Sequence, residues 1–484
     1  MTRKTTLLIV ALLLLAATAD GQSPTCRRAL DSLDSKLRQN YAGFLLELTG
    51  AKRSEYDDVL TRARRDADSQ ALDRCYPVLA RFIAWFDDPH LFVYQSQQVD
   101  SSVARLRAAA LTHVPINEAG AQAALAARAG ALDPIEGIWY NGPLRVAILR
   151  EEEPPSRRFI GVVVASDTAA WPVGVIRSRF TGRPDGSYNA TLLTREFAEL
   201  ELEVRIHKNV LMRFSPGIWG KAFPVAPADT GLLDPVDPRR PHVSIRSDAV
   251  LFSIPSHDPA YTRIVDSLTR AYLPAIREKG ALIIDLRGNE GGGSQTTRAL
   301  NPLIASRVRR PTPYDSGEAV MLSSPAQIAY AKRFTGTDTS AFVRQLVARM
   351  EANPGKLVLL ETTPESPGPE PVTEGDWRVV VLIDGGTVSA AEVLVLRALR
   401  SERATVVGEP TAGALDYQSV SIIGLGIGDY RWGLGYPTIT AHADLPRRGM
   451  RGKGIAPEIP LANLGTADAL KAAEQVISGF RRRQ

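Results

Sequence analysis

The chain has 484 residues, 44% of them apolar, and this length predicts two or three domains with full-sized cores. Its formal charge of +5 is small, and the basic residues are scattered rather than gathered in a stripe among aromatic side chains, which argues against nucleic-acid binding. Beyond the first 19 residues no apolar run is long enough to cross a bilayer.

The first 19 residues have the pattern of a cleaved secretory signal. Arg3 and Lys4 precede a short apolar stretch, which ends in the small residues Ala17 and Ala19. We expect release after Ala19, which lowers the formal charge from +5 to +3. The pattern predicts a secreted or periplasmic protein with no membrane span after cleavage, and a retained anchor is the alternative.

The chain contains two cysteines, Cys26 and Cys75. In an oxidising compartment we expect them to form a disulfide, worth about 4 kcal/mol on the chain-entropy description. The alternative is two free buried thiols. Two separated cysteines without a nearby histidine cluster do not make a metal site, and nothing else in the sequence indicates a metal or cofactor.

Changes in hydrophobic periodicity divide the mature chain into three predicted domains. Residues 20–130 carry apolar residues at three- and four-residue spacing, which predicts an α-helical cap. Residues 131–230 contain short alternating segments between turn signals, which predict a small antiparallel β-barrel or sandwich. In residues 231–484 continuous apolar strands alternate with amphipathic helices, so we expect an α/β core with ligands at the carboxyl ends of its strands.

Two strand ends in the α/β core carry unusual loops. The first is "LIIDLRGNEGGGSQ", where consecutive glycines can turn backbone N–H groups toward an anion or oxyanion, although a plain flexible loop is the alternative. The second is "LIDGGTVSAAEVL". Ser389 and Glu392 fit a capping box there, yet a hydroxyl at a helix start is also well placed for nucleophilic attack.

A serine nucleophile needs a base, and the chain has 6 histidines. His90 follows an amphipathic helix in the turn "WFDDPHL", while His257 and His442 lie within the α/β region as rivals. The lysines that follow Ser389 are only Lys453 and Lys471. The residues alone leave the choice among these bases open.

Several segments together resemble the tail-specific (carboxyl-terminal-processing) serine peptidases. These are "LIIDLRGNEGGG", "VVVLIDGGTVSAAEVLVLRALR" and "VVGEPTAGA", with "GKGIAPEIPL" similar to the closing segment of that family. The turn "FDDPHLF" resembles the Asp-x-His turn of the branch with tricorn core protease and interphotoreceptor retinoid-binding protein. The resemblance implies a crotonase-like core and a peptide or protein substrate.

Carried over residue by residue, the resemblance makes Ser389 the nucleophile and His90 the general base. It assigns the oxyanion hole to the N–H of Ala390 and to a glycine of the pair Gly291 and Gly292. The lysine of the Ser–Lys branch is replaced by Ala414, which argues against a lysine base here.

The third catalytic residue does not carry over. The position of the tricorn-type glutamate is occupied by Arg451, and Pro89 replaces the serine before the histidine. Asp88 is a candidate to orient His90, although adjacent side chains often point apart.

The sequence therefore favours a serine endopeptidase over two other classes of protein. A catalytically inactive binding protein for an apolar ligand or peptide remains the alternative, and a long separation between Ser389 and His90 would favour it. Acyl-CoA chemistry on a crotonase-like core fits poorly with a secretory signal. Substrate specificity and oligomeric state have no sequence signal.

Overall fold

The computed structural model describes most of the chain after residue 24, and the predicted signal segment lies outside the described residues. Among the described residues, no helix combines the length and apolar character needed to span a membrane. The described residues are 25–95, 102, 106, 109–151, 156–167, 171–194, 197, 199–214, 217–308, 310–312, 314, 318–334, 341–360, 371–427, 432–461 and 466–481.

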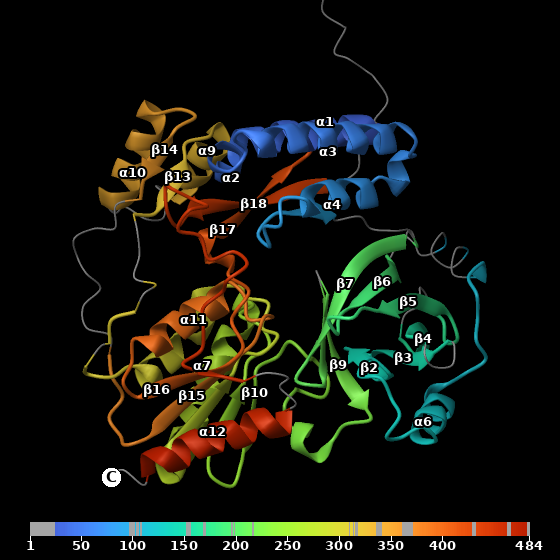
Figure 1. Ribbon diagram of the computed structural model, residues 1–484, viewed down its shortest axis with the longest axis vertical. Coiled ribbons are helices and arrows are strands. Elements are labelled where there is room, and N and C mark those ends of the chain that lie inside the picture. Colours follow the sequence, from blue (N-terminus) through green and yellow to red (C-terminus); the bar gives the residue numbers. More distant parts are fainter. Residues whose placement is uncertain are drawn as a thin grey trace, which may run out of the picture.

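The protein consists of a helical cap, a closed β-barrel and an α/β core (Figure 1). In Figure 1 the cap lies above the core, and the barrel stands beside the core and below the right-hand part of the cap. This arrangement confirms the multidomain fold predicted from the sequence, including the antiparallel barrel.

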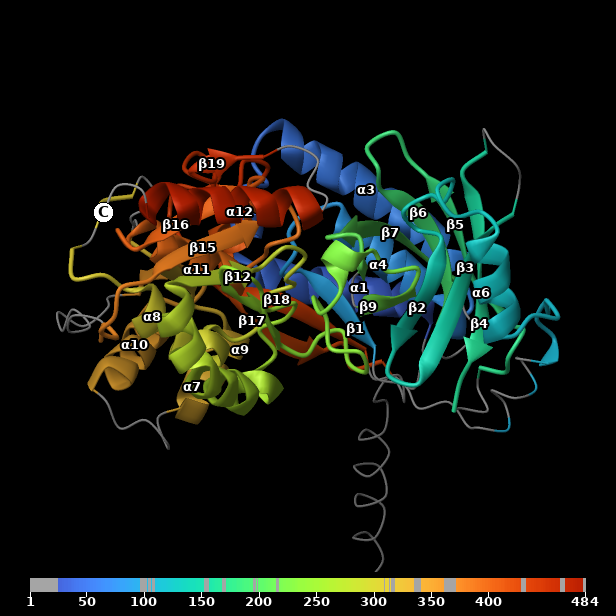
Figure 2. The same cartoon turned by 90° about the horizontal axis from the view of Figure 1, so that it is seen from below.

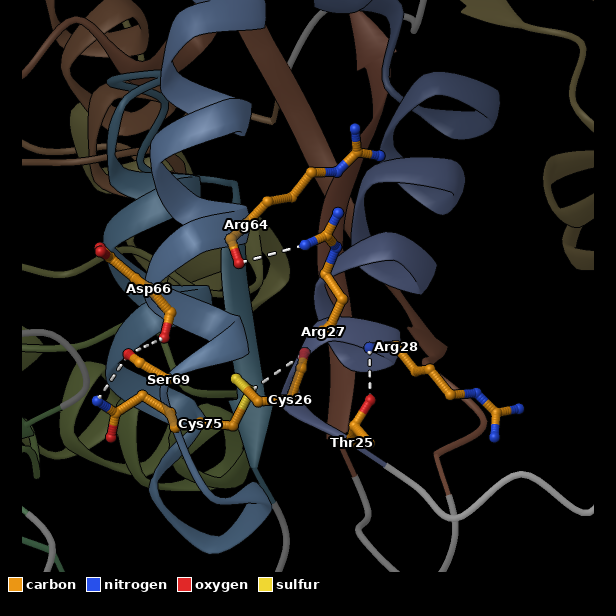
Figure 3. Close-up of a disulfide and its surroundings, with 9 residues drawn as sticks. Thr25, Cys26, Arg27, Arg28, Arg64, Asp66, Ser69 and Cys75 are labelled. Atoms are coloured by element: carbon orange, nitrogen blue, oxygen red, sulfur yellow. Dashed lines mark hydrogen bonds between the residues drawn. A yellow bond between two sulfur atoms is a disulfide. The ribbon is translucent and has the colours of Figure 1, made fainter.

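The cap begins with helices whose apolar faces form one core with the sheet beneath them. The predicted disulfide between Cys26 and Cys75 is present, and it joins the start of the first helix to the residue before the fourth (Figure 3). Thr25 caps the first helix by accepting a hydrogen bond from the Arg28 N–H (3.2 Å). The helices are α1 (Cys26–Asn40), α2 (Ala42–Leu46), α3 (Ala51–Asp68) and α4 (Tyr76–Ala84).

The sheet under these helices combines strands from distant parts of the chain. Its first strand follows the His90 turn, and the other four come from the C-terminal half. Leu434 and Tyr436 of β18 point toward the helices and belong to the cap core. The strands are β1 (Phe92–Gln95), β13 (Val320–Leu322), β14 (Leu357–Leu359), β17 (Tyr417–Gly424) and β18 (Trp432–Thr440), with α9 (Pro325–Phe334) and α10 (Ala341–Ala352) beside them.

The barrel closes by pairing its first strand with its last, and buried aromatic and aliphatic side chains such as Trp139 and Phe159 fill it. The helix α6 (Glu118–Ala126) packs on its outer surface. The strands are β2 (Gly137–Asn141), β3 (Leu144–Arg150), β4 (Arg158–Ala165), β5 (Ile176–Gly182), β6 (Tyr188–Leu193), β7 (Glu199–His207), β8 (Leu211–Phe214) and β9 (Gly217–Phe223).

The core sheet has the strand order β10-β11-β12-β15-β16-β19, and all neighbours except β10 and β11 are parallel. Helices α7, α8 and α11 cover one face and α12 covers the other (Figure 2). The elements are β10 (His242–Ile245), β11 (Val250–Ser253), α7 (Thr262–Lys279), β12 (Ala281–Asp285), α8 (Asn301–Ile304), β15 (Arg378–Ile383), α11 (Ala390–Leu399), β16 (Ala404–Gly408), β19 (Ile459–Pro460) and α12 (Thr466–Arg481).

The parallel strands bring the glycine-rich loop and the Ser389 turn to the same sheet edge. Ile284 of β12 pairs with Val381 of β15, so the loops that follow these strands leave the sheet side by side. The Val388 N–H donates to the carbonyl of Asn289 (3.0 Å), which joins the two loops directly.

Candidate active site

The turn between β15 and α11 presents the Ser389 hydroxyl at the start of the helix. Ser389 immediately precedes the first residue of α11 and is partly exposed. Its φ of 57° lies in the left-handed region, which is uncommon for a residue other than glycine. The strained turn places the hydroxyl at the amino terminus of α11, where negative charge is stabilised.

Glu392 holds this turn in place. One carboxylate oxygen accepts the N–H groups of Ser389 (2.8 Å) and Ala414 (3.0 Å). The other accepts the Thr411 hydroxyl (2.7 Å) and the Gly413 N–H (2.8 Å). Burial raises the pKa of this carboxyl group above its usual value. Glu392 therefore makes the backbone contact expected of a capping glutamate and also ties the helix to the loop after β16.

His90 reaches Ser389 from the cap. It lies in the turn between α4 and β1, where Asp87 adopts a φ of 50°, and only 7% of His90 is exposed. Its Nε2 is 2.9 Å from the Ser389 Oγ, within hydrogen-bond distance. Burial lowers the pKa of His90 to about 4, so the imidazole is neutral at pH 7 and can accept a proton.

Asp88 lies behind the imidazole. One of its carboxylate oxygens accepts the His90 backbone N–H (2.9 Å) and is 3.8 Å from His90 Nδ1. The other oxygen accepts the Tyr41 hydroxyl (2.9 Å). His90 Nδ1 is buried without a hydrogen-bond partner among the described residues. Burial raises the pKa of Asp88 to about 6.

Arg451, where related enzymes are expected to have a glutamate, pairs with a carboxylate of the cap. Its guanidinium donates to both oxygens of Glu47 at 3.0 and 3.1 Å. The Tyr417 hydroxyl also donates to Glu47 (2.6 Å), and the Tyr417 ring lies 5.2 Å from that of Tyr41. The positive charge of Arg451 is thus matched by an acidic residue on the opposite side of the interface.

The glycine-rich loop packs directly against the serine turn. A side chain at Gly291 would meet the Ser389 Cβ at 2.8 Å, so only glycine fits this approach. The Gly291 N–H donates to the buried side chain of Asn289 (2.8 Å). Gly292 is exposed, whereas Ala390 is buried at the first position of the helix.

The C-terminal region of the chain matches a known family of enzymes. Residues 261–461, which include the glycine-rich loop and Ser389, match Peptidase family S41. This region is similar to the serine peptidases of family S41. This finding confirms the resemblance to the tail-specific peptidases that the sequence motifs indicated.

Several solved structures are similar to this chain over most of its length. Mature CPAF in complex with lactacystin has a TM-score of 0.48 and 14% identity, covering 95% of this chain and 99% of that one. The photosystem II D1 C-terminal processing protease has a TM-score of 0.33 and 13% identity, covering 93% and 97%. The tricorn protease has a TM-score of 0.34 and 11% identity, covering 94% and 37%. No curated protein sequence matches the chain.

The rival bases occupy other positions in the structure. His257 is fully buried, and its Nδ1 lies 3.1 Å from the side-chain oxygen of Asn289. Burial lowers the pKa of His257 to about 4. Lys453 lies within 3.5 Å of the Gly449 carbonyl on the surface. These contacts assign His257 to the support of the glycine-rich loop.

A barrel hairpin supports both loops of the S41 domain, which the sequence did not predict. His207 ends β7, and its Nδ1 lies 2.7 Å from the Asp384 carboxylate at the end of β15. Asp384 also accepts the N–H groups of Gly288 and Gly386, each at 2.9 Å. Burial opposes ionisation of Asp384, but His207 and the Gly288 N–H hold its pKa well below the usual range.

The neighbouring residues of this hairpin extend the contact. Lys208 is buried, and its amino group donates to Ser253 (3.1 Å) and pairs with Asp285 at 3.4 Å. The half-buried guanidinium of Arg213 donates to the Gly386 carbonyl. The only sequence signal at this hairpin was a short turn between two strands, because the partners of these side chains lie in another domain.

Proposed function

We propose that this protein is a secreted or periplasmic serine endopeptidase that forms an acyl-enzyme on Ser389, with His90 as the general base. The observation that carries the proposal is the 2.9 Å distance between His90 Nε2 and Ser389 Oγ. A serine hydroxyl is a weak nucleophile at neutral pH and needs an adjacent base. The short distance also argues against the inactive binding protein, which requires neither residue to face the other.

In the proposed reaction, His90 Nε2 takes the Ser389 proton as Oγ attacks the peptide carbonyl carbon. The tetrahedral oxyanion is held by the N–H groups of Ala390 and Gly292, at the positive end of α11. His90 then gives its proton to the leaving amine as the peptide C–N bond breaks. Water then attacks the acyl-enzyme carbonyl while His90 accepts its proton, and this proton passes to Ser389 Oγ as the ester bond breaks and the acid product leaves.

Gly292 is the better of the two glycine candidates for the oxyanion hole. The Gly291 N–H already donates to Asn289 (2.8 Å), and its α-carbon packs against Ser389. Gly291 therefore sets the distance between the loop and the nucleophile, and Gly292 supplies the donor. Asn289 is a positioning residue in this assignment.

We assign Asp88 the role of orienting His90. Its carboxylate is fixed by the Tyr41 hydroxyl and the His90 N–H, each at 2.9 Å. A small rotation of the ring or the carboxylate closes the 3.8 Å gap to His90 Nδ1 into a hydrogen bond. That bond would hold the productive tautomer and stabilise the imidazolium formed during attack.

Two features support the proposed localisation outside the cytoplasm. The first 19 residues have the composition of a secretory signal, and a disulfide joins Cys26 and Cys75. Disulfides persist in oxidising compartments and are rare in the cytosol. Mass spectrometry of the mature N-terminus from an expressing cell tests release after Ala19.

Hydrolysis of an unstructured protein such as casein tests the activity itself. We expect the wild-type protein to cleave casein and Ser389→Ala to lose this activity entirely. An unchanged thermal unfolding profile of the variant would show that its fold is intact. Equal cleavage by both proteins would exclude Ser389 as the nucleophile.

A further inference from the structure

A cavity opens beside the residue that follows the proposed nucleophile. This cavity has a volume of ≈ 180 Å³, about the size of one large side chain. A second cavity, next to α6, is larger at ≈ 380 Å³. One wall of the smaller cavity is formed by Ser294 and Gln295, which follow the glycine-rich loop. The other wall is formed by Ala390 and Leu394 of α11.

The position of this cavity relative to the proposed chemistry identifies which substrate residue can enter it. When Oγ of Ser389 bonds to a peptide carbonyl, the oxygen of that carbonyl faces the Ala390 N–H in the proposed mechanism. The side chain of the same substrate residue branches from the adjacent carbon, so it lies next to Ala390. The cavity beside Ala390 is therefore a candidate subsite for the side chain of the residue whose carbonyl is attacked.

The lining of the cavity is basic. It contains Arg298 and Arg397 and, among the described residues, no acidic one. Asp266 lies 3.8 Å from Arg298, and the Arg298 side chain is 68% exposed. Glu392 of the same helix is enclosed by its four hydrogen-bond donors and does not line the cavity. The positive end of α11 adds to the field at Ala390.

We propose that this cavity is a specificity subsite that selects a carboxylate side chain, glutamate or aspartate, at the residue whose carbonyl is attacked. Arg298 and Arg397 bind the carboxylate, and Gln295 at the rim can donate to it through its amide. This inference rests on the proposed function, because it places the substrate by the Ser389 chemistry. It adds a substrate class that the peptidase assignment does not contain.

Three fluorogenic peptides that differ only in Glu, Gln or Leu at the cleaved position test the subsite. We expect kcat/KM to be about tenfold higher for Glu than for Gln, the size of one charge-assisted contact at a partly exposed site. The preference should weaken as the salt concentration rises, because salt screens exposed charges. Amidated and free C-termini should give equal rates, whereas a preference for a free C-terminus would assign the cavity to a terminal carboxylate.

The double variant Arg298→Gln/Arg397→Gln should lower kcat/KM for the Glu peptide to the value for the Gln peptide, while the Gln peptide is cleaved as before. Arg270→Gln, an exposed change on α7 outside the cavity, is the matched control and should leave the preference intact. A preference for Leu, or a Glu preference that survives the double variant, would overturn the inference.

Labelling with a fluorophosphonate probe separates failure of the subsite from failure of the proposed function. If wild type and the double variant are both labelled but show no Glu preference, the subsite assignment is wrong and the peptidase assignment stands. If the wild-type protein is not labelled, the proposed function itself is wrong. Loss of labelling in the double variant alone would mean that the two arginines maintain the catalytic turn, which also overturns the subsite.

Discussion

At the scale of single residues, the site depends on buried groups whose ionisation is set by their surroundings. Burial lowers the pKa of His90 to about 4 and raises that of Asp88 to about 6. At pH 7 the imidazole is therefore neutral and the carboxyl is ionised. This is the pair of protonation states that a general base and its orienting carboxylate require.

The pH dependence of kcat/KM should report both residues. As the pH falls through about 6, Asp88 takes up a proton and no longer stabilises the imidazolium, so activity declines. A second decline should follow near pH 4, where His90 is protonated. In Asp88→Asn the first step should be absent and the maximal rate lower. An identical profile in wild type and Asp88→Asn would remove Asp88 from the mechanism.

Glu392 is expected to matter for stability as well as for the geometry of Ser389. In Glu392→Gln the side-chain NH₂ group replaces one carboxylate oxygen and faces the two donors that this oxygen accepted. The amide oxygen keeps the other two donors. The unsatisfied donors should lower the free energy of unfolding by about 1–3 kcal/mol. Chemical denaturation measures this loss. The control is Glu402→Gln, the same substitution at an exposed glutamate. Equal stability of both variants would contradict the assigned role.

At the scale of secondary-structure elements, the β7–β8 hairpin joins the barrel to the peptidase domain. His207, Lys208 and Arg213 contact the ends of β12 and β15, which carry the glycine-rich loop and the Ser389 turn. Removing one partner from a buried ion pair leaves the other charge uncompensated. The barrel is therefore a structural support of the active site in addition to any role in binding substrate.

We expect His207→Ala to lower kcat about tenfold or more, because Asp384 would lose its partner and the loops it holds would shift. KM should change less than kcat, since no substrate contact is removed. His242→Ala, a partly buried histidine in β10, is the matched control. Wild-type kcat in His207→Ala would show that the hairpin contact does not position the catalytic loops.

At the scale of the whole molecule, the proposed site forms only where the cap meets the core. The cap supplies His90, and the S41 domain supplies Ser389 and returns β17 and β18 to complete the cap sheet. The hydrogen-bonded ion pair between Glu47 and Arg451 crosses the same boundary. Stability of the cap should therefore influence the distance between His90 and Ser389.

Removal of the disulfide tests this dependence. The double variant Cys26→Ala/Cys75→Ala should lower the free energy of unfolding by about 4 kcal/mol on the chain-entropy description. The variant should lose its activity at a lower temperature than wild type. At about 20 °C, where the cap remains folded, the two proteins should be equally active. A reductant should destabilise wild type and leave the stability of the variant unchanged. Equal stability of wild type and variant without reductant would contradict the prediction.

The sequence predicted the parts of the fold that depend on local pattern. Strand alternation indicated the barrel, continuous apolar strands indicated the core sheet, and motifs singled out Ser389 and His90. It did not predict the cap sheet, because the pairing of Phe92 with Gly435 joins strands from opposite ends of the chain. Nor did the sequence predict the hydrogen bond between His207 and Asp384, because contacts between domains leave no periodic pattern in the sequence.

The most direct test of the central claim is the rate at which a fluorophosphonate probe labels Ser389, with the modified residue identified by peptide mass spectrometry. We expect single-site labelling of wild type, none in Ser389→Ala, and a rate reduced about 10²–10⁴-fold in His90→Ala, the usual contribution of a general base. His113→Ala should label like wild type. Labelling at another residue, or a wild-type rate in His90→Ala, would contradict the account.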